Sequence, residues 1–378
     1  MPSSRSHRRI LTLLGVPVLL APALLVGAAH GSAQDPEPPG RSSVRSITVF
    51  GDSMSDVGTY QAATGDPGNP GAFTVNPGNV WVENVAEHYG LTVTPTRSLT
   101  MDKDASAGAT TQTGTASVLG GNGYAEGGAR IAMLPSQSGV GNNQLVAPLA
   151  DQVERYLASN GSFPADELVL IGGGSNDTFA QFSAVCWGLD NNGVGEGDTT
   201  TASATEAVAE AARAEVALVR EMRAHGARRI VVAGAGDWST NPFARYYLSS
   251  DYQSTGCSTA VPPAQVAAWT REFNRILTRG IAGLPGVSYL DVTRILTRAA
   301  EDPAAYGLVN VTDPACTNTT PTSSAVFCTE DTLVAPDAAR TYLWSDAFHP
   351  TPRGHEILSD AALRLLARAP GGRPAAGR

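Results

Sequence analysis

Short apolar runs alternate with stretches of helical periodicity along most of the chain. Four runs, each followed by glycine or polar residues, predict buried strands at residues 46–50, 167–174, 229–234 and 287–292. Between and after them, apolar side chains recur every three or four residues. This spacing predicts helices at residues 80–90, 145–161, 205–226, 264–283 and 355–369. Strands separated by helices predict β-α-β units, in which helices cover both faces of a parallel sheet.

Three polar segments do not follow this alternation. They lie at residues 92–123, 184–204 and 302–340. We expect them to be loops that decorate the sheet. Long loops on such a scaffold often shape a substrate site.

The first residues of the chain have the pattern of an export signal. Three arginines precede an apolar run at residues 10–29, and small residues follow it up to Ala33. This order predicts a secretory signal peptide at residues 1–33, removed by cleavage after Ala33. An uncleaved membrane anchor is the alternative, because the run approaches the ~20 residues that span a bilayer. Pro17 and Pro22 interrupt the run, and the small residues after it favour cleavage.

The rest of the chain is predicted to form one large α/β domain at residues 46–369, after a flexible leader at residues 34–45. Residues 370–378 are expected to be a disordered tail. The chain carries a formal charge of −9, and its first 33 residues hold three arginines and no acid, which leaves −12 after cleavage. Such a surface repels phosphate backbones, so the composition argues against a nucleic-acid partner.

Four cysteines remain after the predicted cleavage site, at positions 186, 257, 316 and 328. An even count in an exported protein indicates disulfides, and three pairings are possible. The short separation favours Cys316 with Cys328, which leaves Cys186 with Cys257 by default. Zinc ligation is the other possibility, although the chain contains no C-x-x-C pair.

The first predicted strand runs directly into Gly51-Asp52-Ser53, with a second aspartate at Asp56. A simple turn with helix-capping residues would explain the serine and the aspartates. However, ligands of parallel sheets bind outside the carboxyl ends of the strands. Ser53 follows one strand and the polar stretch 174–177 follows another, so both should lie at the same edge of the sheet. This placement favours a functional serine.

A nucleophilic serine needs a base, and the base needs an orienting group. Asp346 and His349 are three residues apart, so the carboxylate can reach Nδ1 of the imidazole in a turn and leave Nε2 free. Pro350 disfavours helix at His349, so we expect the pair on a loop before the final helix. The alternatives are a surface turn with an incidental histidine, and a metal site that adds His355, although this spacing matches no ligand pattern.

Two glycine-rich stretches could supply hydrogen-bond donors to an oxyanion. In "GYAEGGARI", the pair Gly127-Gly128 allows the backbone to approach a ligand closely. In "GGGSND", Asn176 offers a side-chain amide. Both stretches could also be ordinary turns.

Taken in chain order, four motifs resemble those of the SGNH superfamily of GDSL-type hydrolases. They are "VFGDSMSD", "YAEGGA", "GGSND" and "SDAFHP". In these motifs, the residues that match the functional positions of that superfamily are Ser53, Gly128, Asn176, Asp346 and His349. The four motifs span residues 49–350, nearly all of the chain that remains after the predicted cleavage.

The resemblance implies a three-layer α/β/α sandwich, flavodoxin-like, around a five-stranded parallel sheet. It also implies a serine ester hydrolase without metal or organic cofactor. Ser53 would attack the ester carbonyl, His349 would act as base and then acid, and Asp346 would orient His349. The backbone N–H groups of Ser53 and Gly128, with the Asn176 amide, would bind the oxyanion. Asp52 and Asp56 are expected to shape the turn and not to be catalytic.

Finer features are similar to a secreted bacterial branch of esterases and lipases that includes the lecithinase/hemolysin-like proteins. They are "WVENVAEHYGL", "GYAEGGARI" and "NVTDPAC". The chain departs from the family at Gly123, where asparagine is common, and Asn122 lies one residue earlier.

Several activities stay open within this resemblance. They are those of a short-chain esterase, a lipase or phospholipase, an acyltransferase and a polysaccharide O-deacetylase. An inactive surface-binding protein is the non-enzymatic alternative, and the complete set of Ser53, Asp346 and His349 argues against it. The expected partner is a small-molecule or lipid ester, and the expected state is a monomer.

Overall fold

Four parallel strands form the central sheet. In the order in which they pair, they are β1 (Ser46–Gly51), β4 (Glu167–Gly172), β5 (Arg229–Ala233) and β6 (Val287–Leu290). The computed structural model describes residues 44–101, 114–136, 145–188, 199–317 and 324–368. All four strands predicted from the apolar runs are confirmed, each within two residues of its predicted ends.

Alternate residues of each strand belong to two separate hydrophobic cores, one on each face of the sheet. In β4, Val169 and Ile171 face one core, whereas Leu168 and Leu170 face the other. The neighbouring strands continue this alternation. Because successive side chains of a strand point to opposite faces, a run that is apolar throughout requires cover on both sides.

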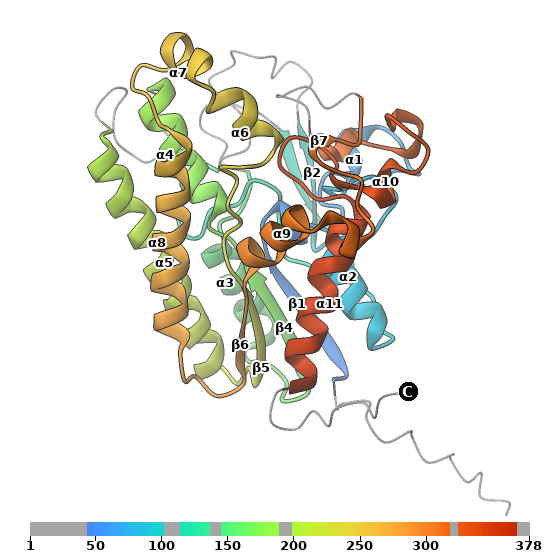
Figure 1. Cartoon of the computed structure of the whole chain (residues 1–378). Coiled ribbons are helices and arrows are strands. Elements are labelled where there is room, and N and C mark those ends of the chain that lie inside the picture. Colours follow the sequence, from blue (N-terminus) through green and yellow to red (C-terminus); the bar gives the residue numbers. More distant parts are fainter. Residues whose placement is uncertain (1–43, 102–113, 137–144, 189–198, 318–323, 369–378) are drawn as a thin grey trace, which may run out of the picture. The chain divides into compact units, whose positions relative to one another are not determined.

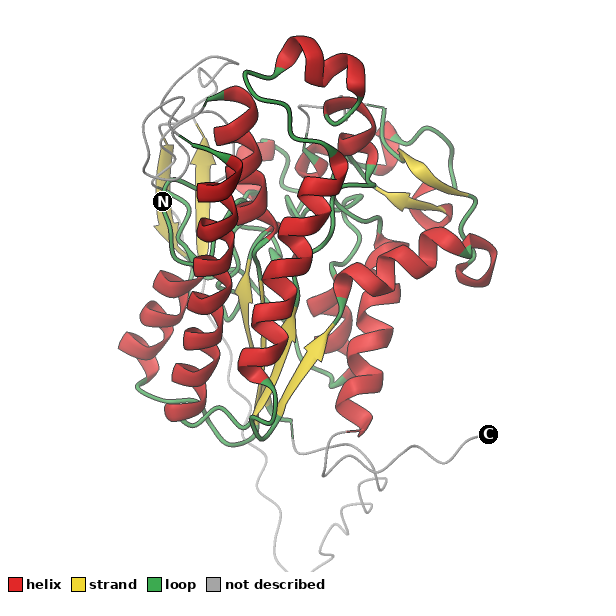
Figure 2. Ribbon diagram, turned by 60° about the vertical axis from the view of Figure 1, so that its left-hand side comes forward, coloured by secondary structure: helices red, strands yellow, loops and turns green. Residues whose placement is uncertain are grey.

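Helices supply this cover, and Figures 1 and 2 show them on both sides of the strands. On the face of Val169 and Ile171 lie α3 (Leu149–Asn160), α4 (Ser175–Trp187), α5 (Thr201–Ala224) and α8 (Pro263–Ile281). On the other face lie α2 (Trp81–His88), α9 (Val292–Glu301) and α11 (Pro352–Arg368). The α/β class and the three-layer α/β/α arrangement are therefore confirmed.

The fifth strand implied by the resemblance is replaced by a shorter contact. In the described part of the chain, residues 122–126 run along β1 and pair with it through one bridge, between Val49 and Gly123. Tyr124 N donates to Val49 O at 2.7 Å, and Glu126 N donates to Gly51 O at 3.1 Å. Glycine is a poor strand former, and Gly121, Gly123, Gly127 and Gly128 lie in or beside this segment, so pairing does not extend into a strand. The contact still carries the chain to the carboxyl end of β1.

Two of the three segments expected to be loops contain more regular structure than predicted, and the third, residues 184–204, holds the end of α4 and the start of α5, while its residues 189–198 lie outside the described ranges. Segment 92–123 contributes an antiparallel pair, β2 (Arg97–Met101) and β3 (Gly114–Val118). Segment 302–340 contributes the short strand β7 (Asn310–Pro314), which pairs with β8 (Tyr342–Trp344), and the short helix α10 (Ala338–Thr341). These elements lack the apolar alternation that identifies buried strands and helices, because most of their side chains are exposed or half-buried.

Several helices were also absent from the prediction. They are α1 (Gln61–Thr64), α4, α6 (Pro242–Tyr247), α7 (Ser250–Gly256) and α9. In α4, eleven of thirteen residues are buried, so the helix has no polar face and therefore no helical periodicity. The others, apart from α9, are too short to show such a pattern.

The predicted signal peptide at residues 1–33, most of the leader and the tail at residues 370–378 lie outside the described residues. Among the helices of the described part, none is long and apolar enough to cross a membrane.

Candidate active site

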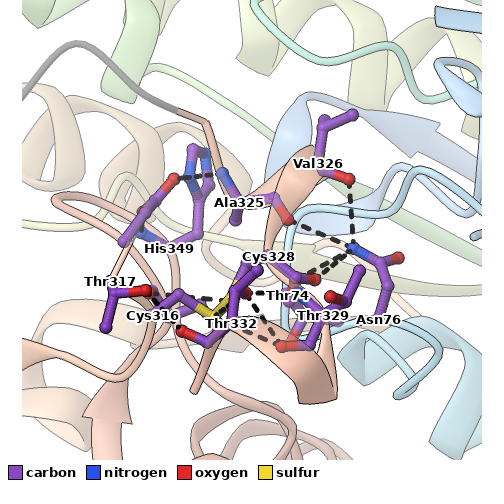
Figure 3. The surroundings of a disulfide bond; sticks show 12 residues. Thr74, Asn76, Cys316, Thr317, Ala325, Val326, Cys328, Thr329, Thr332 and His349 are labelled. Atoms are coloured by element: carbon purple, nitrogen blue, oxygen red, sulfur yellow. Dashed lines mark hydrogen bonds and ion pairs between the residues drawn. A yellow bond between two sulfur atoms is a disulfide. The ribbon is translucent and has the colours of Figure 1, made fainter. Parts of the chain in front are cut away.

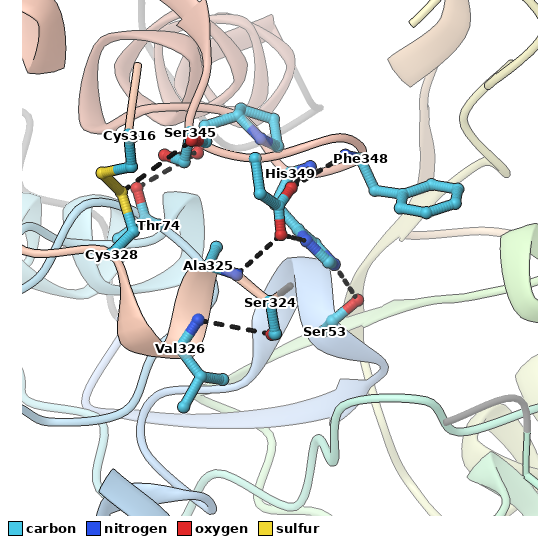
Figure 4. A network of polar contacts seen from close by, with 12 residues as sticks. Ser53, Thr74, Cys316, Ser324, Ala325, Val326, Cys328, Ser345, Phe348 and His349 are labelled. Atoms are coloured by element: carbon cyan, nitrogen blue, oxygen red, sulfur yellow. Dashed lines mark hydrogen bonds and ion pairs between the residues drawn. A yellow bond between two sulfur atoms is a disulfide. The ribbon is translucent and has the colours of Figure 1, made fainter. Parts of the chain in front are cut away.

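The loop between β8 and α11 carries Asp346 and His349, as the sequence predicted. Asp346 Oδ2 lies 2.8 Å from His349 Nδ1, and His349 Nε2 lies 2.9 Å from Ser53 Oγ. Figure 4 shows the imidazole of His349 pointing at the Ser53 hydroxyl. The structure therefore brings together three side chains from opposite ends of the chain. In this arrangement the imidazole can accept the serine proton while the carboxylate holds the other ring nitrogen.

Ser53 opens a 3-10 turn, η1 (Ser53–Ser55), immediately after the carboxyl end of β1. Asp52 caps this turn, because its Oδ1 accepts a hydrogen bond from Met54 N at 3.0 Å. The Trp81 indole N–H donates to Ser55 Oγ at 3.1 Å and fixes the turn from α2. The serine is thus presented on a short, tightly bonded turn at the edge of the sheet.

Asp346 is buried and accepts four hydrogen bonds. Besides His349 Nδ1, the donors are the backbone N–H groups of Phe348 at 2.8 Å, His349 at 2.6 Å and Ala325 at 2.6 Å. Burial alone would raise the pKa of Asp346, but the nearby His349 and the backbone N–H groups of His349 and Phe348 lower it below its ordinary value. The carboxylate therefore stays ionised. A group that orients an imidazole and stabilises its positive charge has to be ionised.

The short disulfide is part of the support of this carboxylate. Cys316 and Cys328 are bonded, and Ala325 lies inside the loop that they close (Figures 3 and 4). Asn76 ties the same loop to the domain, because its Nδ2 donates to the backbone oxygens of Ala325 and Cys328. Cys186 and Cys257 form the second disulfide. Both pairings favoured by the sequence are confirmed.

The three candidate oxyanion donors come from separate segments. Gly128 has a φ of +86°, a backbone conformation that favours glycine. No hydrogen bond within the described residues uses the backbone N–H of Ser53 or of Gly128. Asn176 is the second residue of α4, and its Nδ2 donates to Ala129 O at 2.9 Å and lies 3.4 Å from Asp52 Oδ2. Its amide therefore sits between the neighbours of Ser53 and Gly128.

Two buried aspartates hold the backbone around the serine. Asp56 Oδ1 accepts from the N–H groups of Gly58 and Thr59, and its Oδ2 accepts from Gly127 N at 2.8 Å. Burial raises the pKa of both Asp52 and Asp56 to about 6. Asp56 thus connects the serine segment to the glycine-rich loop.

The contacts of other residues that support the site were not predicted from the sequence, although Asp177 belongs to the motif "GGSND". Asp177 pairs with Arg130 at 3.3 Å and accepts from Ile131 N at 3.0 Å, with both charged side chains buried. Gln152, from α3, makes two hydrogen bonds to the backbone of Gly51, each of 2.9 Å. These contacts depend on which segments meet in the fold, so only the structure identifies them.

His355 does not join the pair formed by Asp346 and His349. It is buried in α11, and its Nδ1 accepts from Trp81 N at 3.2 Å. Burial lowers the pKa of His355 to about 3, so the ring is neutral. Within the described ranges, no group of three or more His, Cys, Asp and Glu side chains is placed to hold a metal ion.

Comparisons with known proteins identify a matching family. A family model described as GDSL-like Lipase/Acylhydrolase matches residues 47–362. Among curated proteins, the anther-specific proline-rich protein APG of Brassica napus is 35% identical over 71 residues. That stretch is 19% of this chain and 16% of the relative, so the similarity extends over a small part of either protein.

Proposed function

The chain belongs to the GDSL-like lipase/acylhydrolase family, and on this premise we propose that it is a secreted serine hydrolase of carboxylic esters that works through an acyl-enzyme. The observation that carries the proposal is the continuous hydrogen-bonded series Ser53–His349–Asp346, with contacts of 2.9 and 2.8 Å. Nucleophile, base and orienting acid are already within hydrogen-bond reach of one another.

In the first half of the reaction, Ser53 Oγ attacks the ester carbonyl carbon and its proton passes to His349 Nε2. Asp346 stabilises the imidazolium that forms. When the tetrahedral intermediate collapses, His349 gives the proton to the leaving alcohol, and the acyl group remains on Ser53.

The oxyanion of the intermediate is held by the N–H groups of Ser53 and Gly128 and by the Asn176 amide. The two backbone N–H groups have no acceptor among the described residues, so both can donate without breaking an existing bond. Asn176 donates one N–H to Ala129 O, and this bond orients the amide while its second N–H has only a long contact. Donors fixed before the reaction give the largest stabilisation.

In the second half of the reaction, water replaces the alcohol. His349 Nε2 takes a proton from the water, the resulting hydroxide attacks the acyl-enzyme carbonyl, and the proton then returns to Ser53 Oγ as the acid leaves. No step needs a metal or an organic cofactor.

Aromatic side chains around His349 favour an apolar acyl group. The ring centroid of Phe73 lies 4.9 Å from that of His349. Phe348, the half-buried neighbour of His349, packs on Phe243 at 4.4 Å and on Phe179 at 5.3 Å. A hydrocarbon chain gains free energy beside such rings, whereas a polysaccharide would need hydrogen-bond partners. We therefore place simple acyl or lipid esters before O-acetylated polysaccharides.

Export would begin with the signal peptide at residues 1–33, followed by the leader and a single hydrolase domain at residues 46–369. The two disulfides support this location, because disulfides persist in oxidising compartments. We propose that the protein is a monomer and that it releases the acid and the alcohol of its ester substrate.

An ester panel on the purified protein tests the function. Wild-type protein should hydrolyse p-nitrophenyl esters, and the chain length with the highest kcat/KM separates an esterase from a lipase. Glycerophospholipid, O-acetylated xylan and an added alcohol acceptor distinguish a phospholipase, a deacetylase and an acyltransferase. No turnover of any ester by folded wild-type protein would contradict the proposal.

A further inference from the structure

We propose that Tyr60 is a positioning residue for the oxyanion site: its hydroxyl orients and polarises the peptide between Gly127 and Gly128. The inference rests on the proposed function, because it concerns the N–H of Gly128 as an oxyanion donor. Tyr60 itself need not touch the substrate. It lies seven residues after Ser53, at the N-terminal end of the short helix α1.

The central contact is a hydrogen bond from the Tyr60 hydroxyl to Gly127 O, of 2.7 Å, with the tyrosine 3% exposed. Gly127 O and Gly128 N–H belong to the same trans peptide unit. In a trans peptide these two groups point in opposite directions. A donor that fixes the carbonyl from behind therefore also fixes the direction of the N–H in front.

The same hydrogen bond changes the strength of the donor. A hydrogen bond to a carbonyl draws electron density toward its oxygen and makes the N–H of that peptide a better donor, because neighbouring hydrogen bonds polarise one another. The effect grows where water is excluded, as it is around these buried groups. Tyr60 would thus strengthen the bond to a negative oxygen more than the bond to a neutral ester carbonyl.

The other side of Gly127 is fixed as well. Its own N–H donates to Asp56 Oδ2 at 2.8 Å. A Cβ added at Gly127 would lie 2.2 Å from the Phe73 ring, so the backbone packs directly on that ring. Phe73 packs edge to face with Tyr60, at 5.5 Å between centroids, and also contacts His349. One aromatic pair therefore sets the position of both the oxyanion peptide and the base.

The variant Tyr60→Phe removes only the hydroxyl. We expect kcat to fall roughly fivefold to tenfold, since one neutral hydrogen bond is involved and the oxyanion donor is misaligned, not lost. KM should stay within about twofold, because the bond matters chiefly when negative charge develops. The rate at which a fluorophosphonate labels Ser53 should fall in parallel, since its tetrahedral adduct places an oxygen in the same site.

Tyr156→Phe is the matched control. The Tyr156 hydroxyl is also buried and donates at 2.7 Å, to Glu167, which begins β4 at the end of the strand opposite to the candidate active site. This variant should lower the melting temperature but leave kcat within about twofold. A loss of kcat specific to Tyr60→Phe therefore distinguishes positioning from general destabilisation.

Unchanged kcat in folded Tyr60→Phe, or a rise in KM alone, would overturn the inference. If Ser53→Ala is inactive in the same assay, only the role of Tyr60 is refuted and the proposed function stands. If Ser53→Ala is active, the proposed function itself is contradicted. Should Tyr60→Phe not fold, 3-fluorotyrosine at position 60 keeps the shape and donates more strongly. It should raise kcat and the labelling rate, and a fall in both would overturn the inference.

Discussion

Replacement of Asn176 by alanine separates a catalytic amide from one that only closes a turn. In the structure, one N–H of the Asn176 amide donates to Ala129 O, while the other makes only a 3.4 Å contact with Asp52. The substitution should therefore also lower stability, because alanine leaves the buried Ala129 carbonyl without its donor.

Two magnitudes follow from these contacts. Loss of one oxyanion donor should lower kcat by roughly 10²–10³, with little change in KM. Loss of the bond to Ala129 should lower the free energy of unfolding by about 1–3 kcal/mol, which is the usual cost of an unpaired buried group. Asn176→Asp should be at least as damaging to kcat, since a carboxylate cannot donate and would lie beside Asp52.

Steady-state kinetics and chemical denaturation on the same preparations measure both effects. Asn122→Ala is a suitable control: the Asn122 side chain makes three hydrogen bonds to the backbone of Ile47, Thr92 and Thr94, near the start of β1. It should lose a similar amount of stability while kcat stays within about threefold of wild type.

The opposite pattern would refute the reasoning. If Asn176→Ala is destabilised as expected but keeps near-normal kcat, Asn176 is a structural residue that holds Ala129. The oxyanion would then be bound by the two backbone N–H groups alone.

Three further predictions follow. Burial raises the pKa of Glu83 to about 7 and of Asp56 to about 6, so the protonated carboxyls favour the folded state. The melting temperature should therefore rise as pH falls from 7.5 to 5, and Glu83→Gln should make this rise smaller; an unchanged slope would contradict the assignment to Glu83. Replacement of both Cys316 and Cys328 by serine should lower the free energy of unfolding by about 3 kcal/mol, because the disulfide closes a loop with a sequence separation of 12. The same double variant should also have a lower kcat, since Ala325 in that loop donates to Asp346. Equal kcat would show that the loop keeps its place without the disulfide. Dialysis against EDTA should leave the activity unchanged, and activity restored by a divalent cation would contradict the metal-free mechanism.

The central sheet could be predicted from the sequence because it is buried on both faces. The interior positions of a strand such as β4, from Leu168 to Ile171, are then apolar on both faces, and such an apolar run is visible without any structure. Helix α4 was not predicted, and burial is again the reason. Burial on all sides removes the polar face by which a helix is identified. The pair β2 and β3 is held by backbone pairing; the residues of β3 after Gly114 are exposed and Leu99 in β2 is buried, which leaves no apolar alternation.

Some residues of the candidate site could also be identified from the sequence, and others could not. Ser53, Asp346 and His349 stand out because each belongs to a short motif with its own chemistry. Tyr60 and Gln152 do not, because their role depends on hydrogen bonds to backbone groups of distant segments. Many side chains that carry an N–H or O–H group could donate to a backbone carbonyl, so such contacts leave no residue pattern that sequence reasoning can identify.

The account depends most on Ser53 as the nucleophile. We would treat the wild-type protein and Ser53→Ala with a fluorophosphonate, follow p-nitrophenyl ester hydrolysis, and map the adduct by mass spectrometry. The account predicts one adduct per chain, on Ser53, formed in proportion to the loss of activity. Ser53→Ala should take up no label and should retain less than about a thousandth of the wild-type kcat, since removal of a triad member costs ~10⁴–10⁶. An adduct on another residue, or a folded Ser53→Ala protein with more than about a tenth of the wild-type rate, would contradict it.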